Sequence, residues 1–268
     1  MQIKKGSSAN NGYWESIVFA LVCLFFSSLA VAQQTQSLPE SIKQIAPSVV
    51  GIAIYAPIES KAPQILGTGF VVGNGKYIVT NYHVVSKDLD PTIVQNFVAL
   101  SGTGPNPALH KMEIVAIDPV HDIAILSIDK TLPALKLAND ALVDPGTSVF
   151  FTGFPIGAVL GLYPATHQGI IAAVTPDVNP ASNANQLTLQ MLDRLKTPFL
   201  IYQLDATAYP GNSGSPVFNR NNNKVVAIIN KVFVSQGKES ALTNPSGISY
   251  AIPIRDLRKL AKTVDLTL

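Results

Sequence analysis

Short apolar runs rich in Val, Ile and Gly, separated by Gly, Pro and Asn, recur along most of this chain. This pattern predicts β-strands joined by turns and loops. The runs fall into two series, residues 48–126 and 148–254, and the segment 130–145 between them is predicted to be a crossover. We therefore expect a mainly β protein in two successive parts.

Helical patterns are confined to short segments near the ends. Residues 33–47 are predicted to be an N-terminal arm with a short helix, because Ser37 and Glu40 have the spacing of a capping box and Pro47 ends the pattern. Residues 255–264 are predicted to form a C-terminal helix.

The first residues have the features of a secretory leader. Two lysines precede an apolar core at 17–26, and an Ala-Val-Ala cleavage site ends at Ala32. The core is shorter than the ~20 apolar residues that a membrane-spanning helix needs. We predict a signal peptide at 1–32, a periplasmic or secreted protein, and no membrane span after cleavage. An uncleaved membrane anchor is the alternative.

Composition limits the partners and the redox chemistry. The single cysteine, Cys23, lies in the leader, so we expect neither disulfides nor thiol chemistry after its removal. The chain has 19 basic and 17 acidic residues. Such a balance gives no reason to expect a nucleic-acid partner.

Three segments carry candidate catalytic residues. Ser213 lies in the sequence GNSGSP, His83 follows an apolar run, and Asp122 opens another apolar run. Taken singly, Ser213 could belong to a surface turn, His83 could be a hydrogen-bonded histidine at a strand end, and Asp122 could cap a strand. Together they stand in the order His, Asp, Ser, which is typical of chymotrypsin-type barrels and not of subtilisin-like or α/β-hydrolase enzymes.

Each residue type suits one step of nucleophilic catalysis. A serine hydroxyl needs a base to accept its proton, and the imidazole of His83 would be that base. The carboxylate of Asp122 would fix the tautomer of the ring. Gly211 allows a tight bend that points N–H groups inward, so we assign the amides of Gly211 and Ser213 to an oxyanion hole.

The chain resembles the trypsin-fold serine proteases of the HtrA/Deg type, with the protease domain alone. The resemblance rests on residues 67–72, 78–85, 122–126, 153–157, 168–171, 205–206, 211–216, 225–228 and 247–254. It covers about residues 46–260, and we therefore do not expect the PDZ domain that many members carry.

The resemblance implies an all-β fold of two six-stranded barrels with the triad in the cleft between them. The protease domain would span 48–268, with barrels at about 48–130 and 146–254. His83 would be the general base, Asp122 the orienting acid and Ser213 the nucleophile, acting on polypeptides without a cofactor. Members are often homotrimers joined through the N-terminal arm, which makes a homotrimer one candidate assembly.

The nucleophile motif also departs from the HtrA pattern. Ser215 replaces a glycine, which is closer to the glutamyl endopeptidases, but the strand 226–231 lacks the histidine with which those enzymes bind acidic side chains. Thr207, six residues before the serine, would lie at the base of the specificity pocket, so we expect cleavage after small or aliphatic residues and not after basic ones. The alternative is that Thr207 faces elsewhere. Asn212 replaces the aspartate that pairs with a new N-terminus in zymogens, so activation by N-terminal clipping is not expected.

Two further features of the sequence are an insertion at 184–197 and three histidines outside the candidate triad. In residues 184–197 apolar side chains recur at every fourth position, which indicates a short amphipathic helix; it could gate the oxyanion turn, contact a partner, or simply pack on a barrel. His110, His121 and His167 lack metal-ligand spacing, so no metal site is expected.

The predicted function is that of an exported serine endopeptidase. The alternative is an inactive polypeptide-binding or chaperone-like protein on the same fold.

Overall fold

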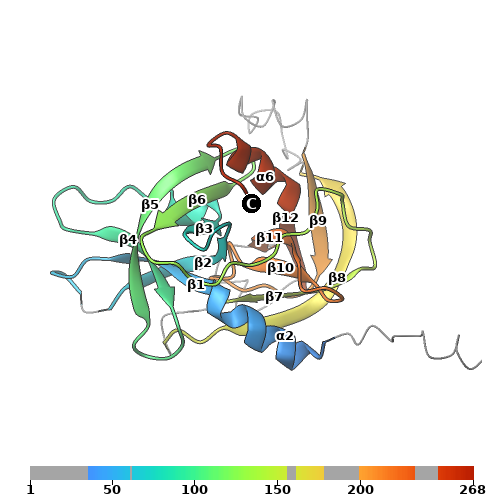
Figure 1. The fold of residues 1–268 in the computed structure, drawn as a ribbon, viewed down its shortest axis with the longest axis horizontal. Helices are drawn as coiled ribbons and strands as arrows, with labels where there is room; N and C mark the ends of the chain where they lie inside the picture. Colours follow the sequence, from blue (N-terminus) through green and yellow to red (C-terminus); the bar gives the residue numbers. More distant parts are fainter. Residues whose placement is uncertain (1–35, 61, 156–160, 178–198, 233–246) are drawn as a thin grey trace, which may run out of the picture. The chain divides into compact units, whose positions relative to one another are not determined.

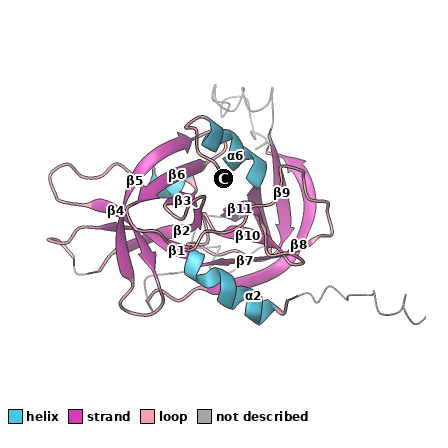
Figure 2. Cartoon of the chain, in the orientation of Figure 1, coloured by secondary structure: helices cyan, strands magenta, loops and turns pink. Residues whose placement is uncertain are grey.

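The computed structural model describes residues 36–60, 62–155, 161–177, 199–232 and 247–268 (Figure 1). These residues form two closed antiparallel barrels of six strands each, which confirms the predicted all-β fold class (Figure 2). The predicted signal peptide at 1–32 and the insertion at 184–197 lie outside the described residues.

The first barrel has the strand order β1-β2-β3-β6-β5-β4. Its strands are β1 (Val49–Tyr55), β2 (Gln64–Val72), β3 (Tyr77–Thr80), β4 (Asn96–Ser101), β5 (Ala108–Asp118) and β6 (Ile123–Ile128). Alternate apolar side chains point inward and close its interior, among them the fully buried Ile52, Ile78 and Leu126. The strands β1, β3 and β6 are buried along nearly their whole length, which is the physical reason why short apolar runs predicted strands here.

The second barrel has the strand order β10-β11-β12-β9-β8-β7. Its strands are β7 (Ser148–Gly153), β8 (Ala165–Pro176), β9 (Leu200–Asp205), β10 (Pro216–Asn219), β11 (Val225–Val232) and β12 (Ile248–Pro253). Phe151, Leu204 and Val217 belong to its core. The hydroxyl of the buried Tyr202 accepts the backbone N–H of Val143 at 2.8 Å, and burial raises the pKa of this tyrosine.

A third apolar cluster packs the barrels against each other. Phe70 and Ile125 come from the first barrel, and Phe150 and Phe218 from the second; the last two rings stack with centroids 4.9 Å apart. Because the contact is apolar and fully buried, the relative position of the barrels is fixed. A residue of one barrel can therefore be placed accurately against a residue of the other.

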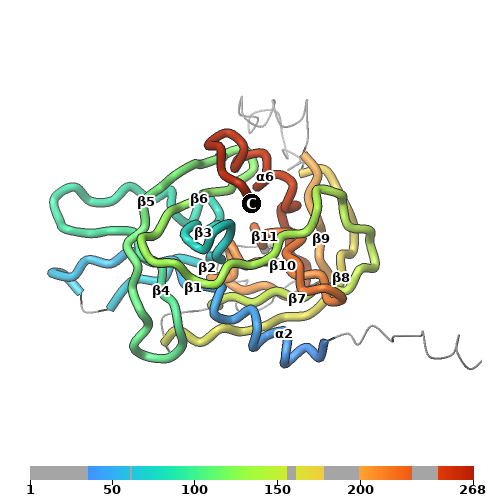
Figure 3. The backbone as a smooth tube through the Cα atoms, viewed as in Figure 1, coloured from blue at the N-terminus to red at the C-terminus, as the bar shows by residue number. Residues whose placement is uncertain are grey.

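The crossover between the barrels, residues 129–147, runs along the apolar cluster that joins them (Figure 3). Leu135 N–H donates to Val71 O of the first barrel, and Ala138 N–H donates to Val225 O of the second. The helix α6 (Ile254–Lys262) covers the same cluster with Leu257 and Leu260. The crossover and α6 therefore hold the two barrels together on the side where they meet.

The helix α2 (Leu38–Ile45) precedes the first strand through the turn η1 (Ala46–Ser48). Ser37 and Glu40 form a capping box at its start. The side-chain amide of Asn223, at the tip of the β10–β11 hairpin, donates to Ser41 Oγ at 2.9 Å. No helix within the described ranges is long and apolar enough to cross a membrane.

Candidate active site

His83 and Asp122 lie on neighbouring segments of the first barrel. His83 belongs to the one-turn helix α3 (Tyr82–Val85), directly after β3, and Asp122 lies between β5 and β6. Tyr82 N–H donates to Asp122 O at 3.2 Å, and the side-chain amide of Asn81 donates to the same carbonyl at 3.0 Å. The two segments are thus joined by hydrogen bonds to the backbone as well as by the contact of the two side chains.

The backbone of Asp122 adopts a positive φ of 55°. This region is unfavourable for residues other than glycine, although aspartate tolerates it better than most. The turn before it is fixed by Asp118, whose carboxylate accepts the N–H groups of Val120 and His121 at 3.0 Å and contacts the His121 ring at 2.6 Å. These contacts hold Asp122 in an orientation that turns its carboxylate towards His83.

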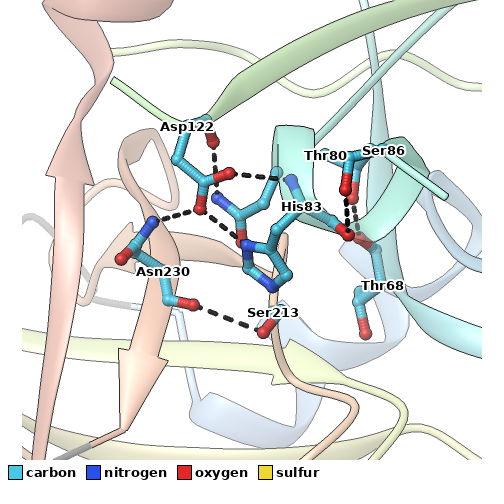
Figure 4. Close-up of polar contacts among 8 residues, drawn as sticks. Thr68, Thr80, His83, Ser86, Asp122, Ser213 and Asn230 are labelled. Atoms are coloured by element: carbon cyan, nitrogen blue, oxygen red, sulfur yellow. Dashed lines mark hydrogen bonds and ion pairs between the residues drawn. The ribbon is translucent and has the colours of Figure 1, made fainter. Parts of the chain in front are cut away.

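The carboxylate of Asp122 accepts three hydrogen bonds (Figure 4). The backbone N–H of His83 donates to Oδ1 at 2.8 Å, and His83 Nδ1 and Asn230 Nδ2 both contact Oδ2 at 2.6 Å. A carboxylate can only accept, so the proton between it and the neutral ring belongs to His83 Nδ1. His83 Nε2 is then left as the acceptor, which is the tautomer that a general base needs.

Asn230 comes from β11 of the second barrel, and its place depends on a β-bulge. The pairing of β11 with β12 shifts register between Ile229 and Lys231, so Asn230 is the extra residue without a partner in the ladder. Bulges re-aim side chains next to functional sites. Here the Asn230 amide reaches Asp122, and the Asn230 carbonyl accepts Ser213 Oγ at 3.3 Å. Asn230 is not among the site residues predicted from the sequence, where it stands as an amide at the end of the apolar run 226–229.

Ser213 lies in the turn before β10, beside the ring of His83 (Figure 4). Its hydroxyl donates to the backbone carbonyl of Asn230 at 3.3 Å. The structure thus brings the three predicted residues together where the barrels meet, with His83 and Asp122 from the first barrel and Ser213 from the second.

The turn around Ser213 leaves two amides free. The N–H of Asn212 donates to Tyr209 O at 3.0 Å, and that of Gly214 donates to Ile229 O at 2.9 Å. The N–H groups of Gly211 and Ser213 have no acceptor within the part of the chain that the structure describes. These are the two amides that the sequence assigned to the oxyanion hole.

The backbone of the turn requires its glycines. Gly211 and Gly214 have φ values of 99° and 86°. A Cβ atom at Gly214 would lie 2.1 Å from Thr68 O, so any larger residue would push the turn away from the first barrel. The glycines on either side of the serine are therefore needed for the bend and for the close approach of the two barrels.

A cavity of about 370 Å³ opens beside the His–Asp pair. It is lined by Tyr82, His83, Pro119, Val120, Asp122, Asp177, Phe199, Ile201, Asn230 and Ile252, and so by both barrels. Thr207 is half-buried between the buried Ala206 and Ala208, in the segment that leads to the nucleophile turn. Its predicted place at the base of the specificity pocket stays a prediction.

The other histidines lie outside this constellation. His110 is buried, contacts Ser101 Oγ at 2.8 Å, and has its pKa lowered by burial and by the charge of Lys130, with a smaller opposing effect of Asp129. His167 stacks on Phe151 with ring centroids 5.0 Å apart, and burial lowers its pKa. Within the described ranges, no three His, Cys, Asp or Glu side chains gather in a way that could hold a metal ion.

Comparisons with known proteins agree with this geometry. A model of the trypsin-like peptidase domain matches residues 67–228. A protein of Pseudomonas putida W619 named "Probable periplasmic serine endoprotease DegP-like" is 33% identical over 192 residues, which is 71% of this chain and 33% of that relative. A relative of the same name from Halomonas elongata is 29% identical over 225 residues, 82% of this chain and 40% of that protein. The chain thus spans about a third of the length of the curated relatives that it matches.

Solved structures show the same fold. The crystal structure of the serine endoprotease from Yersinia pestis has a TM-score of 0.60 at 23% identity, over 85% of this chain and 66% of that chain. The active form of the Rv3671c protease from M. tuberculosis has a TM-score of 0.62 at 20% identity, over 85% of each chain. The family model covers more than half of the chain, so this chain belongs to the trypsin-like peptidase family, and the curated relatives that it matches are named DegP-like.

Proposed function

We propose that this protein is an exported serine endopeptidase that hydrolyses peptide bonds through an acyl-enzyme. The observation that carries the proposal is the hydrogen-bonded His83–Asp122 pair beside Ser213, with the free amides of Gly211 and Ser213 on the same turn. These are the base, the orienting carboxylate, the nucleophile and the oxyanion donors of acyl transfer.

Acylation begins with the hydroxyl of Ser213. In the resting site this hydroxyl donates to Asn230 O at 3.3 Å. Rotation of the side chain towards His83 Nε2 exchanges one hydrogen bond for another, at a net cost of about 1 kcal/mol or less. Ser213 Oγ then bonds to the scissile carbonyl carbon while its proton passes to Nε2, and the negative charge on the carbonyl oxygen is held by the two free amides.

The remaining steps return the enzyme to its starting state. The tetrahedral intermediate collapses when the C–N bond breaks and the His83 imidazolium gives its proton to the leaving amine. Water then enters, gives a proton to Nε2 and bonds to the acyl carbon. The ester bond breaks while Nε2 returns that proton to Ser213 Oγ, which releases the carboxylic acid and restores Ser213 and the neutral His83. Asp122 stays ionised throughout and stabilises the imidazolium in both halves of the cycle.

Polypeptides are the proposed substrates, cleaved after small or aliphatic residues. Thr207 is small and uncharged, so a basic side chain would find no carboxylate at that position. The relatives named as periplasmic endoproteases and the predicted leader at 1–32 both support action on misfolded or exported proteins outside the cytoplasm. The proposed protease domain is 48–268, preceded by the arm at 33–47.

Digestion of a peptide library and of unfolded casein, followed by mass spectrometry, tests the activity and the preference together. We expect fragments ending in small or aliphatic residues, with no cleavage by Ser213→Ala. The exposed serine Ser60 provides a matched control, and Ser60→Ala should cleave as the wild type does. A wild-type protein that binds casein but releases no fragments would be a polypeptide-binding protein instead.

A further inference from the structure

Thr68 is a buried residue of the first barrel that contacts the nucleophile turn of the second. It lies in β2 between two glycines and has no exposed surface. A Cβ atom at Gly67 would come within 3.0 Å of Ser213 O. The strand therefore approaches the turn closely, and the side chain of Thr68 between the two glycines is placed to bind it.

Thr68 holds the carbonyl groups on both sides of Asn212. Its backbone N–H donates to Ser213 O at 2.9 Å, and its hydroxyl donates to Gly211 O at 2.7 Å. Gly211 has a φ of 99° and the conformational freedom of glycine, so the Gly211–Asn212 peptide, which carries this carbonyl, can rotate unless a contact fixes it. The hydroxyl of Thr68 supplies that contact. Fixing this peptide restricts the backbone torsions of Gly211, whose N–H, in the preceding peptide, is a proposed oxyanion donor.

The direction of the Thr68 hydroxyl is itself determined by its neighbours. Phe154 N–H donates to Thr68 Oγ1 at 3.0 Å, which leaves the hydroxyl proton for Gly211 O. The Thr68 carbonyl accepts the hydroxyl of Thr80 at 2.7 Å (Figure 4). Thr80 ends β3, three residues before His83. A short chain of hydrogen bonds thus connects the segment that carries the base with the turn that carries the nucleophile.

We propose that Thr68 is a positioning residue that orients the oxyanion amide of Gly211 relative to Ser213. The inference rests on the proposed hydrolysis by Ser213. Thr68 does not touch the reacting atoms and acts through the carbonyl of Gly211. Because the negative charge on the carbonyl oxygen is present in the tetrahedral intermediate and its flanking transition states but not in the bound substrate, loss of the hydroxyl lowers kcat and leaves KM nearly unchanged.

Thr68→Val removes the hydroxyl but keeps the shape and the backbone hydrogen bonds. Loss of a complete oxyanion donor typically lowers the rate by about 100- to 1000-fold. Since Thr68→Val misplaces a donor without removing it, we expect kcat to fall by about 10- to 100-fold with KM within about twofold. Thr68→Ser keeps the hydroxyl and should restore most of the wild-type kcat.

A transition-state analogue separates positioning from a merely structural role. A peptide aldehyde forms a hemiacetal with Ser213 and uses the oxyanion donors, so its affinity should fall about as much as kcat in Thr68→Val. The matched control is Thr152, a fully buried threonine of β7 whose hydroxyl contacts Thr166 Oγ1 at 2.8 Å. Thr152→Val should change thermal stability without changing kcat or aldehyde affinity.

The outcomes distinguish this inference from the proposed function. A wild type that does not hydrolyse peptides contradicts the proposed function and this inference with it. An active wild type with unchanged kcat in Thr68→Val, or with equal losses in Thr68→Val and Thr68→Ser, contradicts the positioning role alone. If Thr68→Val does not fold, Thr80→Val tests the same chain of hydrogen bonds, and a kcat equal to the wild type in that variant overturns the proposal.

Discussion

Asn230→Ala should slow hydrolysis although Asn230 belongs to neither the predicted triad nor the oxyanion hole. The substitution removes the amide that donates to Asp122 Oδ2 at 2.6 Å but keeps the backbone carbonyl that accepts from Ser213. A hydrogen bond to a charged group contributes about 1.5–3 kcal/mol. At about 1.36 kcal/mol per factor of ten, that range corresponds to a loss of about 10- to 150-fold.

The partial exposure of the carboxylate places the expected loss in the lower part of this range. The side chain of Asp122 is 19% exposed, so water can replace part of the lost hydrogen bond. We therefore expect kcat/KM to fall by about 10- to 50-fold. Initial rates on a fluorogenic peptide, with substrate well below KM, measure this ratio directly.

A surface asparagine provides the matched control for Asn230→Ala. Asn222, at the tip of the β10–β11 hairpin, also has one side-chain hydrogen bond, from Lys224 N–H at 3.0 Å. Asn222→Ala should keep the wild-type kcat/KM. If Asn230→Ala were as active as the wild type while remaining folded, the hydrogen bond from the second barrel to Asp122 would have no role in catalysis. The bulge that places Asn230 would then contribute nothing to the reaction.

Three further predictions concern the turn, the pH dependence and the crossover. In Gly153→Ala the new Cβ would lie 2.0 Å from Ser215 Oγ and 2.8 Å from Asn212 Oδ1, so buried side chains of the nucleophile turn must shift and kcat/KM should fall at least about tenfold; a variant as active as the wild type contradicts the tight fit. Burial lowers the pKa of His167 in the folded state, so the unfolded chain takes up its proton first and stability is lost as pH falls below about 6.5. In a Ser213→Ala background that prevents self-digestion, His167→Phe should therefore lose less Tm between pH 7.5 and 5 than the parent does, and equal losses would contradict this. Arg258 donates to Leu268 O at 2.9 Å and to the carbonyl of Ala138 in the crossover. Arg258→Met should therefore lower the Tm by about 4 °C or more at unchanged kcat, and an unchanged Tm would show that these hydrogen bonds do not stabilise the fold.

The strands and the candidate catalytic residues were predictable from the sequence, for a physical reason. A strand buried on both faces is a short continuous apolar run, and the turns between strands favour Gly, Pro and Asn, so both are local properties of the chain. The sequence GNSG needs glycines at fixed places because Gly211 and Gly214 have positive φ values. Such requirements are local, so they leave a local signal.

Contacts that depend on register or on distant segments left no such signal. Asn230 reaches Asp122 because a bulge in β11 shifts the register by one position. The apolar run before Asn230 contains no residue pattern that indicates this shift. Thr68 looks like an ordinary strand residue between two glycines. Its hydroxyl meets Gly211 only because the two barrels pack in one particular way. The positive φ of Asp122 likewise depends on the turn held by Asp118.

Mapping the site of reaction with a fluorophosphonate tests the central claim most directly, because only a serine activated by a neighbouring base reacts quickly. The protein is incubated with the probe, digested with trypsin and analysed by mass spectrometry. We predict one adduct, on Ser213, that is absent in Ser213→Ala and strongly reduced in His83→Ala. An adduct that persists in Ser213→Ala, or a folded wild-type protein that does not react, would contradict the claim that these residues from two barrels form one catalytic site.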